Sequence, residues 1–82
     1  MNKFNELVFK QMKTMDELLN TQSELERYEQ IERKLHNLHN ETALKTVRER
    51  IVCMKSRLTE IQHIFEKQTN ELIQSYKEKS HS

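Results

Sequence analysis

The 82-residue sequence contains no glycine, no proline and no tryptophan, and only one cysteine. Glycine and proline most often make tight turns and stop helices, so their absence argues against a fold with many turns. Aromatic residues make up 6% and hydrophobic residues 34% of the chain, which limits the core that one copy can bury. A third of the residues are charged, and the whole composition is typical of long amphipathic helices.

Long apolar segments are also missing. No run approaches the roughly 20 residues that cross a bilayer, and the N-terminal sequence MNKFNELVFK lacks the apolar centre of a signal peptide. Cys53 has no second cysteine with which to form an intramolecular disulfide, and this is typical of a reducing compartment. These features predict a cytoplasmic protein without membrane association. The net charge of +1 argues against a general polyanion binder, which needs a large basic excess.

Apolar residues recur every three to four positions in both halves of the sequence. From Leu44 to Leu72 the repeat spans four heptads, with Gln68 in its polar position, and it predicts an amphipathic helix that packs in a coiled coil. In the first half the repeat has Gln11 and Gln22 in its polar positions. Its apolar members are Phe4, Val8, Met15, Leu18 and Leu25, followed less regularly by Tyr28, Ile31, Leu35 and Leu38.

The segment LHNLHNETAL separates the two repeats. If the first repeat continued in one helix, positions 42 and 45 would be apolar, but they are Thr42 and Lys45. The second repeat begins at Leu44, out of phase with the first. Asn37 and Asn40 tolerate the left-handed conformation that ends helices, and Asn40 can also cap the next helix. The segment therefore predicts a turn.

We accordingly predict an all-α fold, a two-helix antiparallel coiled-coil hairpin. Its helices are expected at about 3–37 and 41–78, with a turn at about 37–42 and a frayed C-terminal tail. The alternative is one continuous helix in a parallel coiled coil, which the lack of glycine and proline favours.

A hairpin pairs residues whose numbers add to about 79 or 80. This register places Gln11 opposite Gln68, where two side-chain amides can hydrogen-bond and set the register at some cost in stability. An acidic segment of the first helix then lies opposite a basic segment of the second. The expected ion pairs are Glu29 with Arg50 and Glu24 with Lys55.

No catalytic residue, metal ligand set or cofactor motif is recognisable. His36 and His39 are three residues apart near the turn, but a zinc site needs three or four ligands and Cys53 is expected at least two helical turns away. A helical hairpin also offers little of the concave, partly dry surface that catalysis needs. We therefore expect a protein that is not an enzyme and that needs no cofactor.

The basic run KTVRERIVCMKSR raises the alternative of a nucleic-acid accessory protein. Two features argue against nucleic-acid binding. The segment expected opposite this run is acidic, and the run has no aromatic side chain on which bases can stack.

A surplus of apolar residues lies outside the two repeats, in the parts of the helices farthest from the turn. Exposed apolar surface of this kind marks an interface, and the simplest partner is a second copy, giving a dimer with four helices in a bundle. A helical surface of another protein is the alternative partner, while nearby carboxylates argue against a membrane surface. The residues expected at this interface are Leu7, Phe9, Met12, Leu19, Ile64 and Ile73.

These expectations define the predicted function. We expect a non-catalytic protein–protein interaction module, a small adaptor or regulator. The alternatives are a purely structural homo-oligomer and a nucleic-acid accessory protein.

Three segments of the sequence, KTMDELL, QSELERYEQIE and EKQTNELIQSY, resemble the YgaB-like family of small proteins from bacilli. The similarity extends over nearly the whole chain. It implies a small, helical, cytoplasmic bacterial protein, and it transfers no catalytic or binding residue.

Overall fold

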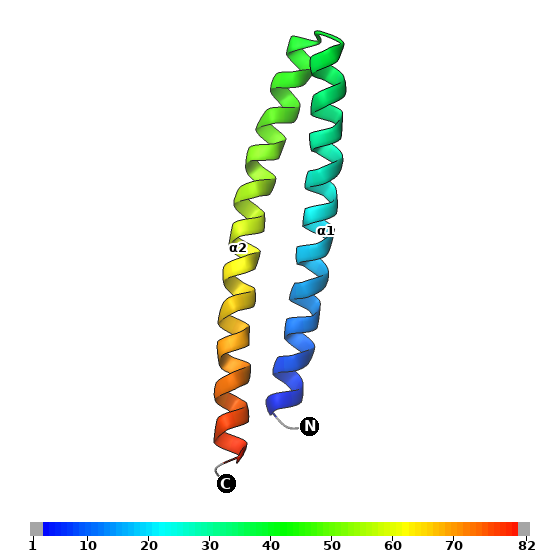
Figure 1. Ribbon diagram of the computed structural model, residues 1–82. Coiled ribbons are helices and arrows are strands. Elements are labelled where there is room, and N and C mark those ends of the chain that lie inside the picture. Colours follow the sequence, from blue (N-terminus) through cyan, green and yellow to red (C-terminus); the bar gives the residue numbers. More distant parts are fainter. Residues whose placement is uncertain (1–2, 81–82) are drawn as a thin grey trace.

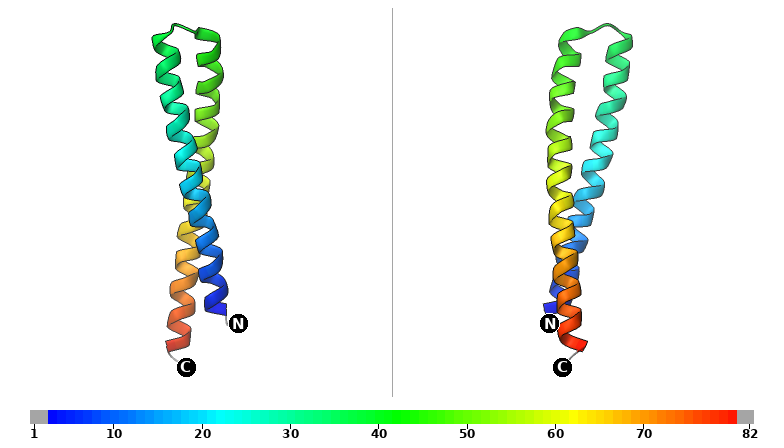
Figure 2. Two further views of the ribbon diagram at one scale, coloured as in Figure 1. Left: turned by 90° about the vertical axis from the view of Figure 1, so that its right-hand side faces the viewer. Right: turned by 60° about the vertical axis from the view of Figure 1, so that its left-hand side comes forward.

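Two long helices joined by a short turn form the protein, seen in a computed structural model that describes residues 3–80 (Figure 1). Helix α1 spans Lys3–Asn37 and helix α2 spans Glu41–Ser80. The helices lie side by side and run in opposite directions, so the start of α1 and the end of α2 lie together, away from the turn (Figure 2). The predicted all-α antiparallel hairpin is therefore confirmed.

The hairpin is long and thin, with principal dimensions of 64 × 16 × 14 Å. One continuous helix of this chain would approach about 120 Å at 1.5 Å per residue, so the alternative of an unbroken helix is excluded. The second helix, expected to end at about residue 78, continues to Ser80. Residues 81–82 of the expected frayed tail lie outside the described residues.

Backbone hydrogen bonds end α1 without a glycine. The Asn40 amide donates to the Leu35 carbonyl and the His39 amide donates to the His36 carbonyl, each at 3.1 Å. These two bonds form a Schellman motif, which needs a left-handed residue directly after the helix. His39 takes that conformation, with a φ of 56°. The sequence pattern predicted Asn37 or Asn40 as the left-handed residue, and this was wrong. Asn37 is still helical in α1, and Asn40 is the residue that caps α2.

Asn40 caps the start of α2, as predicted. Its side-chain oxygen Oδ1 accepts a hydrogen bond from the Ala43 amide at 3.2 Å, and its carbonyl accepts one from the Leu44 amide at 3.0 Å. The side-chain bond satisfies an amide that has no partner within the helix. Glu41, in the first turn of α2, adds a negative charge at the positive end of the helix dipole.

The register of the two helices follows the prediction. In each of three contacts across the hairpin the residue numbers add to 80, within the expected range of 79 to 80. These contacts join Phe4 to Tyr76, Gln11 to Thr69, and Glu32 to Arg48.

The buried side of α1 differs from the prediction by one residue in three places. Val8, Met15 and Gln22 were expected at the helix–helix interface, but the buried residues are their predecessors Leu7, Thr14 and Thr21. Both sets repeat every seven residues, and they differ by about 100° around the helix. Threonine is small enough for close approach of α2, and the Thr14 hydroxyl is satisfied within its own helix by donating to the Lys10 carbonyl at 3.2 Å.

The hydrophobic core lies between the turn and the middle of the hairpin. Leu25, Ile51 and Met54 form its buried centre, and Tyr28, Val47 and Leu58 pack against it. We call residues 23–57 the turn half, and residues 3–22 with 58–80 the open half. At the interface of the open half, polar residues replace much of the apolar packing. They are Gln11, Thr14, Thr21, Gln68, Thr69 and Ser75, all buried or half-buried.

Candidate interaction surfaces

The hairpin has two broad faces, one on each side of the helix–helix interface. Successive residues of an α-helix are about 100° apart, so a residue that directly precedes or follows an interface residue lies on one or the other face. Because α1 and α2 are right-handed and antiparallel, residues that precede interface positions on both helices lie on the same face. Residues that follow interface positions on both helices lie on the opposite face.

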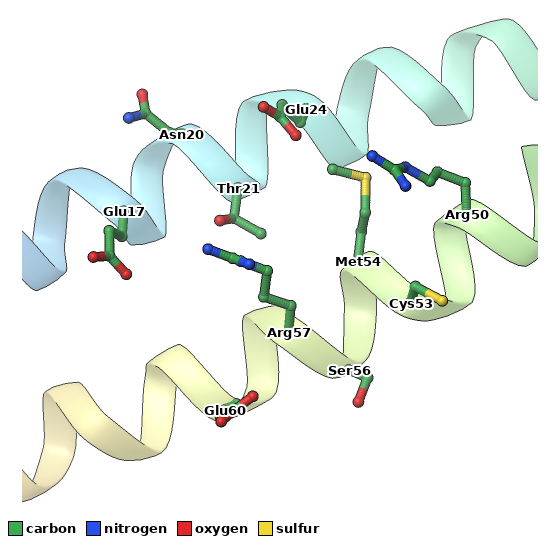
Figure 3. A pocket seen from close by; sticks show the side chains of 10 residues that line it. All are labelled: Glu17, Asn20, Thr21, Glu24, Arg50, Cys53, Met54, Ser56, Arg57 and Glu60. Atoms are coloured by element: carbon green, nitrogen blue, oxygen red, sulfur yellow. The ribbon is translucent and has the colours of Figure 1, made fainter.

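The first face carries an open groove of about 700 Å³ lined mainly by charged and polar side chains (Figure 3). The side chain of Arg57 extends from α2 toward Thr21 of α1, and the thiol of Cys53 points away from α1. The groove residues that directly precede interface positions are Glu17, Asn20 and Glu24 of α1 and Arg50, Cys53, Arg57 and Glu60 of α2. We call this side of the molecule the charged face.

Opposite charges meet on the charged face, but not in the expected pairs. Glu24 was expected beside Lys55 and Glu29 beside Arg50; instead Glu24 lines the groove together with Arg50 and Arg57. The expected partners belong to opposite faces, because Glu24 and Arg50 directly precede interface residues, whereas Lys55 and Glu29 directly follow them.

One ion pair does cross the hairpin near the turn. Arg48 Nε lies 3.1 Å from Glu32 Oε2, and both side chains are partly exposed. Exposed pairs of this kind stabilise a fold by at most about 1 kcal/mol, so this one contributes mainly to the choice of register.

The second face is apolar in the open half. Met12 and Leu19 are 61% and 52% exposed. Val8 is half-buried beside them, and Met15 completes the strip on α1. We call the following residues the flank patch: Val8, Met12, Met15 and Leu19 of α1, with the exposed Ile73 and Tyr76 of α2.

The six residues predicted at a partner interface do not share one surface. Met12, Leu19 and Ile73 belong to the flank patch, and Phe9 is 60% exposed on the outer side of α1, with Lys13 Nζ 5.1 Å from its ring centre. Ile64 is exposed on the charged face.

Leu7 requires a correction, because it is only 8% exposed and packs at the helix–helix interface. Met15 and Tyr76 are exposed residues of the flank patch that the sequence pattern did not predict there. The signal that could have found them is their position directly after interface residues. For Met15 only the correct buried side of α1 reveals this position, whereas Tyr76 follows the half-buried Ser75 of α2.

The predicted polar layer exists with different partners. The Gln11 amide nitrogen Nε2 donates to the Thr69 hydroxyl and to the Phe65 carbonyl, the latter at 3.2 Å. The Thr69 hydroxyl in turn donates to the Phe65 carbonyl at 3.0 Å. Gln68 does not pair with Gln11, and its buried oxygen Oε1 has no hydrogen-bond partner. The expected bond between the two amides was therefore wrong, whereas the role of Gln11 in connecting the helices across the open half is real.

The described residues offer no cluster of three or more histidine, cysteine or acidic side chains that could hold a metal ion. His36 and His39 lie at the turn, and Cys53 is an exposed free thiol on α2. Between residues 3 and 80, no helix is long and apolar enough to cross a membrane.

These features define a class of protein: a small, elongated, all-α hairpin with a thin core, one charged face and one partly apolar face. A family model described as YgaB-like protein matches residues 3–79, and the chain belongs to this family. It is 44% identical over 77 residues to the uncharacterised protein YgaB of Bacillus subtilis strain 168. The aligned region covers 94% of this chain and 68% of that protein. The resemblance seen in the sequence is thus confirmed. No solved structure matches the chain.

Proposed function

We propose that this chain is a non-catalytic protein–protein interaction module that acts in the cytoplasm and binds through the flank patch. The single observation that carries the proposal is the exposure of apolar side chains on one face of the open half, while polar side chains take up part of the adjacent helix–helix interface. In a stable soluble helix the larger apolar residues face the core. Here Met12 and Leu19 face outward, as expected of residues that a partner covers.

The charged face supports a non-catalytic role. Its acidic and basic side chains lie in an open groove, where water surrounds them, and not in the enclosed pocket that acid–base chemistry needs. The same face argues against the nucleic-acid alternative. Arg50 and Arg57 share the groove with Glu17, Glu24 and Glu60, so their positive charges are offset locally.

Site-specific photocrosslinking in living bacteria tests the proposal. A photoreactive phenylalanine analogue replaces Met12, and in a matched control it replaces Phe9, which is equally exposed on the same helix but outside the patch. We expect protein adducts from position 12 and far fewer from position 9. Adducts with a different protein identify an adaptor or regulator, and adducts with further copies alone identify the structural homo-oligomer. Equal adduct formation at both positions, or none at position 12, would refute the proposal.

A further inference from the structure

We infer that the flank patch binds the same patch of a second copy, with α1 packed antiparallel on α1 of the other hairpin around a two-fold axis between Met12 and Met15. This inference rests on the proposed interaction function and names its partner. It also specifies an arrangement, in which the open halves overlap and the two turns point in opposite directions.

The exposed area of the hairpin leaves room for such an interface. Its solvent-accessible surface is 6685 Å² for a mass of 10.0 kDa. A folded monomer of that mass is expected to expose about 5,200 Å², so this chain exposes well over 1,000 Å² more. A stable interface of standard size removes about 800 Å² from each partner. The excess surface is therefore sufficient for one partner of this size.

The sequence of the α1 strip is self-complementary. Reading along the helix, Val8, Met12, Met15 and Leu19 are apolar, and the next positions outward on the same side are the uncharged Asn5 and Gln22. A two-fold axis between Met12 and Met15 pairs Met12 with Met15, Val8 with Leu19, and Asn5 with Gln22. Each apolar residue then meets an apolar residue, and each amide meets an amide, as an isologous interface requires.

The surroundings of Met12 and Met15 favour this overlap over a bundle in which both turns lie at the same end. In that second arrangement α1 lies on α2 of the partner, and Met12 and Met15 fall at the level of Thr69 and Glu66. A carboxylate would then be placed against methionine side chains without a cation, which is unfavourable. In the antiparallel overlap the methionines pack on each other instead.

The charged turn halves stay outside the antiparallel overlap. On the same side of the molecule as the patch, the turn half carries Glu26, Glu29, Arg48 and Lys55 together with the exposed Val52, and the overlap does not reach these residues. Glu66 is the exception, because it lies on α2 at the level of the two-fold axis and approaches its own symmetry mate in this arrangement. Glu66→Gln removes this repulsion and is therefore expected to lower the dissociation constant of the dimer.

Crosslinking of mixed single-cysteine variants tests the arrangement. In a Cys53→Ser background, Val8→Cys is mixed with Leu19→Cys, and separately with Ile73→Cys, and each mixture is oxidised mildly. The antiparallel overlap predicts a mixed disulfide between positions 8 and 19 and little between positions 8 and 73. A mixture of Ser23→Cys with Ser56→Cys, which are exposed and outside the patch, is the control and should yield no product.

Light scattering over a concentration series tests the dimer itself. We expect twice the chain mass for the unaltered protein and at least about tenfold weaker association for Met12→Glu combined with Leu19→Glu. Phe9→Glu, a matched change outside the patch, should leave association unchanged. A monomer at all concentrations, or a dimer linked through positions 8 and 73, overturns the inference. If the chain is monomeric but position 12 still crosslinks to another protein, the proposed function stands and only the identity of the partner is wrong.

Discussion

Single residues carry the least regular features of this hairpin. His39 takes a left-handed conformation that glycine or asparagine adopts more readily, and Gln68 buries an oxygen without a hydrogen-bond partner. Both are local departures from the most stable choice of side chain. Each therefore predicts a substitution that raises stability.

Replacing the left-handed residue should stabilise the turn. His39→Gly removes the conformational strain of a side chain at positive φ, although glycine also gains freedom in the unfolded chain. We expect the free energy of unfolding to rise by about 0.5 to 1 kcal/mol, measured by urea unfolding followed by circular dichroism. Lys34→Gly, inside the last turn of α1, is the control and should lower it by about 1 kcal/mol. Equal destabilisation by both changes would contradict the assigned conformation.

Removing the unpartnered amide should also stabilise the fold. Gln68→Leu eliminates a buried acceptor without a partner and adds apolar packing, so the free energy of unfolding should rise by about 1 kcal/mol or more. Gln11→Leu should gain less, because it also removes the bonds to Thr69 and Phe65. Thermal unfolding of both variants at the same concentration measures the difference. A larger gain for Gln11→Leu would mean that the cross-helix bonds contribute nothing.

At the scale of the element, α1 has two apolar sides that compete for burial. Leu7, Leu18 and Leu25 lie on the side that packs against α2, whereas Met12 and Leu19 lie on the flank. Together these two sides form an apolar surface that is wider than the strip a two-stranded coiled coil needs. Helices that pack in larger bundles commonly have an apolar surface of this width. Helix α2 has a more regular interface, with Leu44, Ile51, Met54 and Ile61 all buried.

The assignment of the buried side of α1 can be tested by truncation. Leu7→Ala should lower the free energy of unfolding by about 2 kcal/mol or more, because it leaves a cavity at the interface. Phe9→Ala should change it by no more than about 0.5 kcal/mol, since that ring is mostly exposed. Urea unfolding of both variants gives the comparison. The reverse order of effects would show that Leu7 is not the buried residue.

At the scale of the whole molecule, the hairpin is long and thin because the described residues 3–80 form just two helices packed side by side. Two helices bury few side chains completely, and most of each helix surface faces water or a partner. The stability of such a protein should rise with concentration if a second copy covers the flank patch.

Small-angle X-ray scattering checks the shape of the single hairpin. The Met12→Glu and Leu19→Glu double variant, in which the flank patch carries two charges, should give the mass of one chain and a longest dimension slightly above 64 Å. The helices should remain intact because neither residue is at the helix–helix interface. A longest dimension near the roughly 120 Å of a continuous helix would show instead that the turn opens in solution.

The sequence alone predicted the fold because periodicity and capping are local properties. The phase break before Leu44 and the cap at Asn40 predict the position of the turn. The position of the turn in turn predicts the register, because residues equally far from the turn on the two helices pair. The family resemblance was also recognisable in the residues themselves.

Only the tertiary structure decided which side of α1 is buried. The two candidate repeats of α1 share Phe4, Gln11, Leu18 and Leu25. They differ only at the positions between these residues, where the two candidates are neighbours about 100° apart around the helix, and hydrophobicity alone favours Met15 over Thr14. Packing reverses this preference because the small threonines allow close approach of α2, and the Thr14 hydroxyl is satisfied within its own helix; the methionines are left outside. This choice moves Leu7 from the expected partner interface into the helix–helix interface of the hairpin, and it creates the flank patch.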